Sequence, residues 1–172
     1  MKTSASALGA VLQAVRAVAT AWVVICFIVM TVSVWAEVGG RYIFNYSIAA
    51  SSELATMAQI WMVLVGAGLA ARQDLHARVD ALVNLLPRPV QRAMLLIGSG
   101  LGLVFLMSIV VGAVPIFERG LAQTTPSLGL PMAVPYAGLF VGPIYFAVEV
   151  VALTVRQWRG ETVAPVVAEH TL

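Results

Sequence analysis

Four long apolar stretches, separated by shorter polar segments, dominate the pattern of positions along the chain. They cover about residues 17–36, 53–71, 93–114 and 132–155. A helix of about 20 residues, rising ~1.5 Å per residue, crosses a hydrocarbon core of roughly 30 Å. None of the stretches alternates polar and apolar residues as the strands of a membrane barrel do. The pattern therefore predicts an all-α integral membrane four-helix bundle, one domain over residues 1–160, followed by a mobile tail over residues 161–172.

The first stretch has a second interpretation, a cleaved signal peptide. Val34-Trp35-Ala36 loosely resembles a cleavage site. The apolar region is longer than the hydrophobic core of a signal peptide, and it ends with a bulky tryptophan. We therefore favour a retained membrane helix.

Residues that favour turns stand where the helices are expected to end. Gly39-Gly40 is expected to end the first helix and Pro115 the third, while Ser51 or Ser52 is expected to cap the second. Residues 120–131 are rich in Gly, Pro, Ser and Thr and predict a loop. Pro135 and Pro143 fall inside the last stretch, where we expect them to kink the helix.

The link between the second and third stretches is amphipathic. Apolar residues recur there at helical spacing, at Val79, Leu82, Val83 and Leu86. Prolines at positions 87 and 89 follow them. This pattern predicts a short amphipathic helix that lies on the membrane surface.

The basic residues are distributed unevenly between the two sides of the predicted bundle. With four spans, eight Lys and Arg residues fall on the side of the termini and only two, Arg41 and Arg119, on the other. Loops on the cytoplasmic side carry the excess of Lys and Arg in membrane proteins. We therefore expect both the N-terminus and the C-terminus in the cytoplasm.

Composition excludes several classes of protein. The 172 residues are 60% hydrophobic and 10% charged, too few charges to cover a water-facing surface. The small excess of ten Lys and Arg over eight Asp and Glu argues against nucleic acid as a partner. Both histidines, His76 and His170, lie outside the spans, and Cys26 is the single cysteine, so neither haem nor a multi-cysteine site is expected. We expect no catalytic residues, no cofactor and no metal.

Glu149 is the one charge well inside a predicted span. An intramembrane carboxylate is costly, so it is either an ion site or paired. Arg16 and Arg92 are expected at the right depth to pair with it. We favour pairing, because a single carboxylate makes a poor proton or ion relay.

Further contacts are expected at a few residues in or beside the spans. Arg41 and Glu53 flank the first outer connection, and we expect them to form an ion pair that pins residues 42–50, the alternative being that each is solvated. Trp61, at mid-span, is expected to pack on lipid or on another protein. The pairs Gly98-x-x-x-Gly102 and Gly138-x-x-x-Gly142 are weak indications of close helix packing.

Most of the chain resembles one family of membrane proteins. The pattern from 41 to 87 is similar to the small membrane subunit of tripartite ATP-independent periplasmic (TRAP) transporters. The residues that carry the resemblance are Arg41-Tyr42-Ile43-Phe44-Asn45, Ser52-Glu53-Leu54, Trp61, Gly66-Ala67, Arg72, His76-x-Arg78-Val79-Asp80 and Leu85-Leu86-Pro87, and later Thr125-Pro126-Ser127-Leu128-Gly129-Leu130-Pro131 and Tyr136. Such proteins often begin the second helix with two acidic residues, whereas here Ser52 precedes a single Glu53.

The resemblance implies a role in transport without catalysis. In such systems a soluble periplasmic protein captures a substrate, commonly an organic acid, and a large many-span membrane subunit carries it inward with sodium. The small subunit binds the large one as a scaffold in the bacterial inner membrane, in contact with lipids, and its outer loops are expected to help dock the soluble protein. The structural or subunit-interface candidates are Arg41, Asn45, Glu53, Trp61, Arg72, His76, Arg78, Asp80 and Glu149.

Two other classes of function compete with this one. A small transporter or channel made by self-association would move solute without another protein. A membrane anchor of an enzyme complex would hold a cofactor or a polar pocket. The sequence does not identify the substrate.

Overall fold

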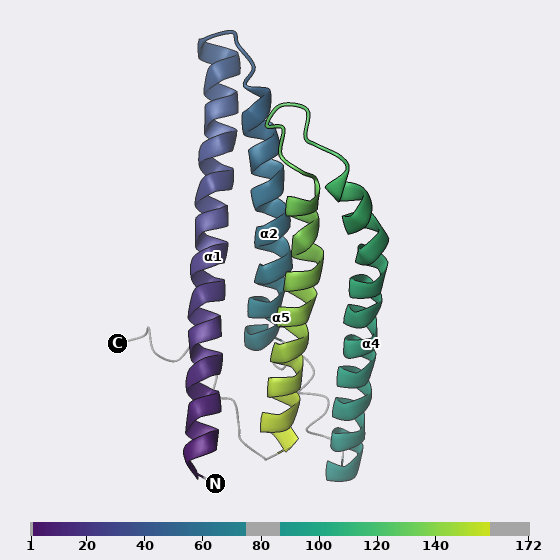
Figure 1. The fold of residues 1–172 in the computed structure, drawn as a ribbon. Helices are drawn as coiled ribbons and strands as arrows, with labels where there is room; N and C mark the ends of the chain where they lie inside the picture. Colours follow the sequence, from purple (N-terminus) through teal and green to yellow (C-terminus); the bar gives the residue numbers. More distant parts are fainter. Residues whose placement is uncertain (1, 75–86, 159–172) are drawn as a thin grey trace, which may run out of the picture.

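The computed structural model describes residues 2–74 and 87–158, and within them the chain forms four α-helices (Figure 1). They are α1 (Lys2–Ile43), α2 (Ala49–Asp74), α4 (Arg88–Leu121) and α5 (Ala133–Trp158). Each contains a stretch long and apolar enough to cross a membrane, namely Gly9–Ile43, Ala49–Ala71, Pro89–Leu121 and Ala133–Trp158. The prediction of an all-α protein with four membrane helices is therefore confirmed. The predicted surface helix over residues 79–86 and the tail lie outside the described residues.

The four helices stand side by side in the order α1, α2, α5, α4 (Figure 1). The helix α5 packs on both α2 and α4, whereas α1 packs mainly on α2. The connections 44–48 and 122–132 lie at the same end of the molecule, here called the loop end, and α1 begins at the opposite, N-terminal end (Figure 1). The helices α1 and α4 end there, and α2 and α5 begin there, so both connections lie at the loop end.

All four helices extend past at least one predicted end, and two of them run through the residues that were expected to end them. The helix α2 begins at Ala49, so the expected cap at Ser51 or Ser52 is wrong. The helix α1 continues through Gly39-Gly40 to Ile43, and α4 continues through Pro115 to Leu121. A glycine inside a helix costs only about 0.5–1 kcal/mol, so it does not by itself end one. Proline is tolerated in membrane helices because neighbouring groups satisfy the freed carbonyl. The predicted breaks at these positions are therefore wrong.

The actual end of α1 depends on a close backbone approach. The backbone N–H groups of Phe44 and Tyr46 both donate to the carbonyl of Gly40, at 3.2 and 3.0 Å. A Cβ on Gly40 would lie 2.8 Å from the carbonyl oxygen of Tyr46, so only glycine fits there. Asn45 takes a φ of 52°, a left-handed conformation that asparagine tolerates better than most residues.

The two prolines of the last helix differ in position. Pro135 lies in the first turn of α5, where the backbone N–H that proline lacks would have no intrahelical partner. It therefore causes no kink of the predicted kind. Pro143 lies inside the helix and removes one such hydrogen bond.

Of the two GxxxG pairs, only the one in α5 packs against another helix. A Cβ on Gly142 would lie 2.8 Å from the carbonyl oxygen of Leu64, so the backbones of α2 and α5 are in close contact there. Gly98 and Gly102 of α4 have nothing within 4 Å of the position of a Cβ. The predicted packing role therefore holds for the α5 pair within the described chain, and the α4 pair faces outward.

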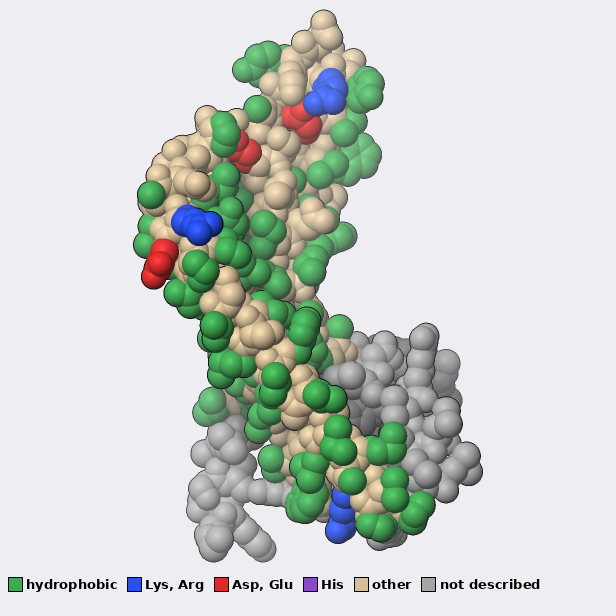
Figure 2. Space-filling view, turned by 90° about the vertical axis from the view of Figure 1, so that its right-hand side faces the viewer, with side chains coloured by type: hydrophobic (Ala, Val, Ile, Leu, Met, Phe, Trp, Pro, Cys, Tyr) green, Lys and Arg blue, Asp and Glu red, His purple; other side chains and the backbone are tan. Residues whose placement is uncertain are grey.

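A small apolar core joins three of the helices, and most of the remaining apolar surface is uncovered. Ala19, Val65 and Tyr145 form the buried cluster, with Val23, Trp61 and Leu69 packed around it. In the most apolar window of α5, 39% of residues are buried, against 6% in α4. Figure 2 shows hydrophobic side chains along much of one face, with the visible acidic side chains toward the loop end. Such a surface is stable only against lipid or another apolar protein.

Candidate functional site

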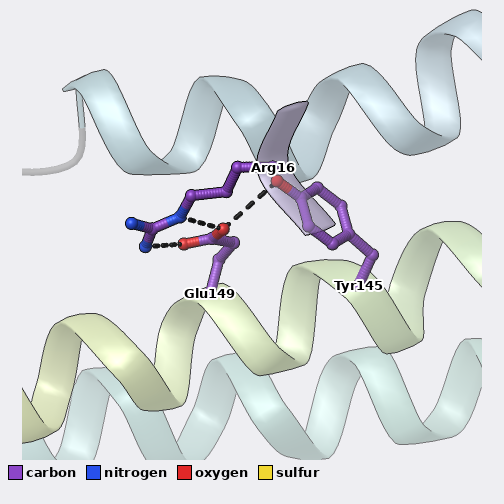
Figure 3. Close-up of polar contacts among 3 residues, drawn as sticks. All are labelled: Arg16, Tyr145 and Glu149. Carbon is purple, nitrogen blue, oxygen red and sulfur yellow. Dashed lines mark hydrogen bonds and ion pairs between the residues drawn. The ribbon is translucent and has the colours of Figure 1, made fainter. Parts of the chain in front are cut away.

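A buried ion pair joins the first and last helices (Figure 3). Arg16 of α1 donates through Nε to Oε1 of Glu149 at 2.7 Å and through Nη2 to Oε2 at 2.6 Å. The Tyr145 hydroxyl, one turn earlier on α5, donates to Oε1 at 3.2 Å. The Glu149 side chain is fully buried, and that of Arg16 is 11% exposed. The two-pronged geometry neutralises the carboxylate and satisfies both of its oxygens.

The structure thus pairs Glu149 with one of the two arginines that the sequence analysis named. The other, Arg92, lies over the ring of Trp158, with its guanidinium carbon 5.5 Å from the ring centroid. This contact holds α4 to the end of α5 through a cation–π interaction.

A second polar contact fixes the long loop to the start of α2. Glu53 accepts the backbone N–H of Ser127 at 2.9 Å and that of Leu128 at 3.0 Å, one on each carboxylate oxygen. Successive backbone N–H groups that point the same way form a natural binding site for an anionic oxygen. Glu53 therefore ties the connection 122–132 to α2 at the loop end.

The loop that Glu53 holds is also closed on itself. Thr125 donates its backbone N–H to the carbonyl of Leu130 at 2.8 Å, and its hydroxyl accepts the N–H of Leu130 at 3.1 Å. Gly129 takes a φ of 66° and donates to the carbonyl of Thr125. The segment is therefore a preformed surface feature, with the backbone of Ser127 and Leu128 held by Glu53.

The predicted ion pair between Arg41 and Glu53 is wrong. Arg41 pairs instead with Glu37, with 3.0 Å between Nη2 and Oε1, while Glu53 binds the loop. The physical reason is the extension of α1 through the two glycines, which places residues 37 and 41 one turn apart on the same face. Glu37 lies just beyond the predicted first span, 17–36, so the pattern gave no reason to expect it on the same helix face as Arg41.

Trp61 is half-buried, and it packs on other helices of this chain in addition to any lipid or partner protein. Its indole N–H donates to the carbonyl of Val134 at 3.2 Å, and its ring meets that of Trp22 edge to face, with 5.6 Å between centroids. The residue therefore joins α1, α2 and the start of α5 within this chain.

The other candidates are placed by the backbone or lie outside the description. Asn45 forms the left-handed turn after α1. Arg72 lies in the last turn of α2. His76, Arg78 and Asp80 fall outside the described residues. Across the described parts of the chain, no three His, Cys, Asp or Glu side chains gather as a metal site would require.

Comparison with known proteins places these features in one family. The family model described as "Tripartite ATP-independent periplasmic transporters, DctQ component" matches residues 30–160. The matched range includes Glu37, Glu53, Glu149 and the loop that Glu53 holds, and it leaves out Arg16.

Three curated relatives agree with the family match. A protein of Haemophilus influenzae, provisionally named a TRAP transporter small permease protein, is 32% identical over 120 residues, covering 67% of this chain and 74% of the relative. The C4-dicarboxylate TRAP transporter small permease protein DctQ of Vibrio cholerae is 32% identical over 84 residues, 49% of this chain and 36% of the relative. The protein of the same name from Rhodobacter capsulatus is 33% identical over 94 residues, 54% of this chain and 41% of the relative.

Proposed function

The chain belongs to the DctQ family of tripartite ATP-independent periplasmic transporter components, and we propose that it is the fixed scaffold of such a transporter. The family consists of transporter subunits, so the protein is not an enzyme. Four membrane helices and this membership make it a multi-pass protein of the bacterial inner membrane. In the proposed role it binds the large membrane subunit, and that subunit carries the substrate.

The observation that carries the proposal is that the buried Glu149 carboxylate is fully hydrogen-bonded by side chains of this chain. A transport site at mid-membrane needs polar groups that can exchange partners with a moving ion or substrate. Glu149 is instead fully buried and held by two short hydrogen bonds from Arg16 and one from Tyr145. This arrangement supports a structural role for the one carboxylate deep in the spans, and with it a scaffold rather than a small independent transporter.

The remaining steps of the proposal concern the whole complex. A periplasmic binding protein captures an organic acid, and the large subunit imports it with sodium. The names of two relatives specify C4-dicarboxylates, which supports an organic acid as the class of substrate. With both termini in the cytoplasm, the loop end faces the periplasm, and the loop held by Glu53 helps to dock the binding protein.

The first experiment is a purification of this chain from its native membrane in mild detergent, with mass spectrometry of the proteins retained. We expect a large many-span membrane subunit in about equal amount. Recovery of the chain only with itself would contradict the scaffold role.

Reconstitution then separates the scaffold from a self-associating transporter. Vesicles that contain this chain alone should show no flux of sodium or organic acid. Vesicles that contain both membrane subunits and the binding protein should show uptake. Flux through this chain alone would favour the independent transporter.

A further inference from the structure

A groove of about 250 Å³ lies between α4 and α5, in the half of the molecule nearest the N-terminal end. Two hydroxyl groups belong to its lining. The hydroxyl of Ser99 is 2.8 Å from that of Thr154, which donates to the carbonyl of Val150 at 2.8 Å. The chain itself thus satisfies these polar groups. The rest of the lining is apolar or glycine, at Leu96, Gly100 and Leu103 of α4 and Val151 and Val155 of α5. Such a groove suits a hydrocarbon chain.

A cation stands at the end of this groove nearest the N-terminal end. Arg92 precedes Leu96 by four positions and Trp158 follows Val155 by three, so each shares a helix face with the lining. The guanidinium carbon of Arg92 is 5.5 Å from the centroid of the Trp158 ring, a contact that leaves its charge in place. Arg92 is exposed, and no carboxylate of the described chain forms an ion pair with it. Its charge is therefore accessible and not neutralised within residues 2–74 and 87–158.

The depths of the cation and the groove correspond to the two parts of a phospholipid. Arg92 directly precedes the apolar stretch 93–114, so it lies where the lipid headgroups begin. From Leu96 to Leu103 the groove follows α4 inward for about 10 Å, at ~1.5 Å per residue. Half of a hydrocarbon core of roughly 30 Å is the depth of one leaflet. The charge and then the apolar groove thus follow one another within a single leaflet, in the order of a headgroup and its acyl chain.

We propose that this groove binds an anionic phospholipid from the leaflet at the N-terminal end. The phosphate accepts charge-assisted hydrogen bonds from Arg92, and one acyl chain lies along the groove. Arg88 begins α4 and Arg156 lies in the last turn of α5, so both helices bring further positive charge to this end. The visible acidic side chains lie toward the loop end (Figure 2). Basic sites between membrane helices are typical binding sites for anionic headgroups.

A helix of another protein is the competing occupant. It would have to bring a carboxylate to the depth of Arg92, whereas the bilayer itself supplies phosphate groups there. The charge therefore favours lipid. The inference goes beyond the proposed scaffold function and requires only that α4 and α5 cross a membrane.

The headgroup is tested on the full chain purified in mild detergent and titrated with phosphatidylglycerol or phosphatidylcholine, with bound lipid measured by native mass spectrometry. We expect tighter binding of phosphatidylglycerol, which carries a net negative charge. Arg92→Gln should weaken that binding about fivefold and remove the preference, as the loss of one arginine near an anionic lipid would. Arg119→Gln removes the same charge at an exposed position near the loop end and should keep the preference. Equal effects of the two changes would overturn the assignment.

The acyl chain is tested by a matched pair of glycine substitutions. Gly100 lines the groove and Gly98 does not, and a Cβ on either meets nothing within 4 Å. The fold should therefore accept both changes, which helix content in micelles checks. Gly100→Leu should fill the groove and weaken the binding of both lipids about fivefold, as the loss of one buried CH₂ contact or slightly more would. Gly98→Leu should leave binding unchanged. Unchanged binding in Gly100→Leu would contradict the groove as the site.

A photoreactive phenylalanine analogue in place of Val151 identifies the occupant in the native membrane, with all subunits of the transporter present. Val151 lines the groove and is 47% exposed. We expect a covalent product with phospholipid, and less of it when Arg92→Gln is added. A product with another membrane protein in place of lipid would overturn the proposal and assign the groove to a protein helix.

Discussion

Glu149 illustrates how far a single residue constrains this molecule. A carboxylate inside a span is costly, so the sequence predicts that Glu149 is either an ion site or paired with an arginine at its depth, Arg16 or Arg92. In the structure Arg16 takes both carboxylate oxygens. Removing one partner of a buried pair leaves the other charge uncompensated, which costs roughly 3–5 kcal/mol. The pair is therefore a strong determinant of how α1 sits against α5.

The change Glu149→Gln should lower the stability of the purified chain, because Arg16 then keeps its charge without a counter-ion. We expect a clearly lower midpoint of thermal unfolding in detergent, and less assembled transporter in the membrane. The double variant Arg16→Met with Glu149→Gln should recover part of the loss, since it no longer buries a lone charge. Normal stability together with lost transport would instead identify Glu149 as an ion site.

Glu53 supports a second prediction at this scale. Glu53→Gln should loosen the connection 122–132, because a neutral amide offers one acceptor oxygen where the carboxylate offers two. Hydrogen exchange at the amides of Ser127 and Leu128 should become faster, and docking of the binding protein weaker, while the helices stay intact. Glu118→Gln, an exposed change near the same end, is the control. Unchanged exchange at both amides would contradict this role of Glu53.

The mistaken pairing of Arg41 shows which residue contacts sequence cannot supply. Arg41 and Glu53 are both charged residues beside one connection, and nothing in the local pattern distinguishes this pairing from others. The contact with Glu37 exists because α1 does not end at the glycines. The two backbone amides that bind Glu53 lie 74 and 75 positions further along the sequence. Such partners depend on tertiary packing rather than on spacing.

At the scale of elements, hydropathy located the four membrane helices but not their ends. The apolar pattern measures the part of a helix that lies in lipid, whereas the helix itself continues into the interface. Thus α1 begins at Lys2 and α4 ends at Leu121, beyond the apolar stretches. In the sequence, the only indication that α5 packs on α2 is the spacing of Gly138 and Gly142. Gly98 and Gly102 of α4 have the same spacing, but no part of the described chain packs on them.

This difference between the two glycine pairs gives a matched prediction. Gly142→Ala would put a methyl group 2.8 Å from the carbonyl oxygen of Leu64, so α2 and α5 must separate. Overpacking of this kind costs about 1–3 kcal/mol, and we expect the midpoint of thermal unfolding in micelles to fall. Gly98→Ala meets nothing within 4 Å and should leave stability unchanged or raise it by up to about 1 kcal/mol, since alanine favours helix. Equal effects of the two changes would contradict the close approach of α2 and α5.

For the whole molecule, the row of four helices leaves its outer members largely uncovered. Only 6% of the most apolar window of α4 and 17% of that of α1 is buried, against 33% in α2. A protein that worked alone around a central pathway would keep free polar groups along that pathway, but here the buried carboxylate of Glu149 is held by Arg16 and Tyr145. The large uncovered apolar surface of the outer helices is therefore suited to contact with lipid and with another membrane protein.

The last prediction concerns how this whole unit sits in the membrane. The excess of Lys and Arg on the side of the termini predicts that the loop end faces the periplasm. Tyr46 at that end is 70% exposed, and Cys26, the single cysteine, is 6% exposed. In a Cys26→Ala background, Tyr46→Cys should react with a membrane-impermeant thiol reagent in right-side-out vesicles and should be protected in inside-out vesicles. The reverse pattern would place the loop end in the cytoplasm, and a periplasmic binding protein could then not dock on the loop that Glu53 holds.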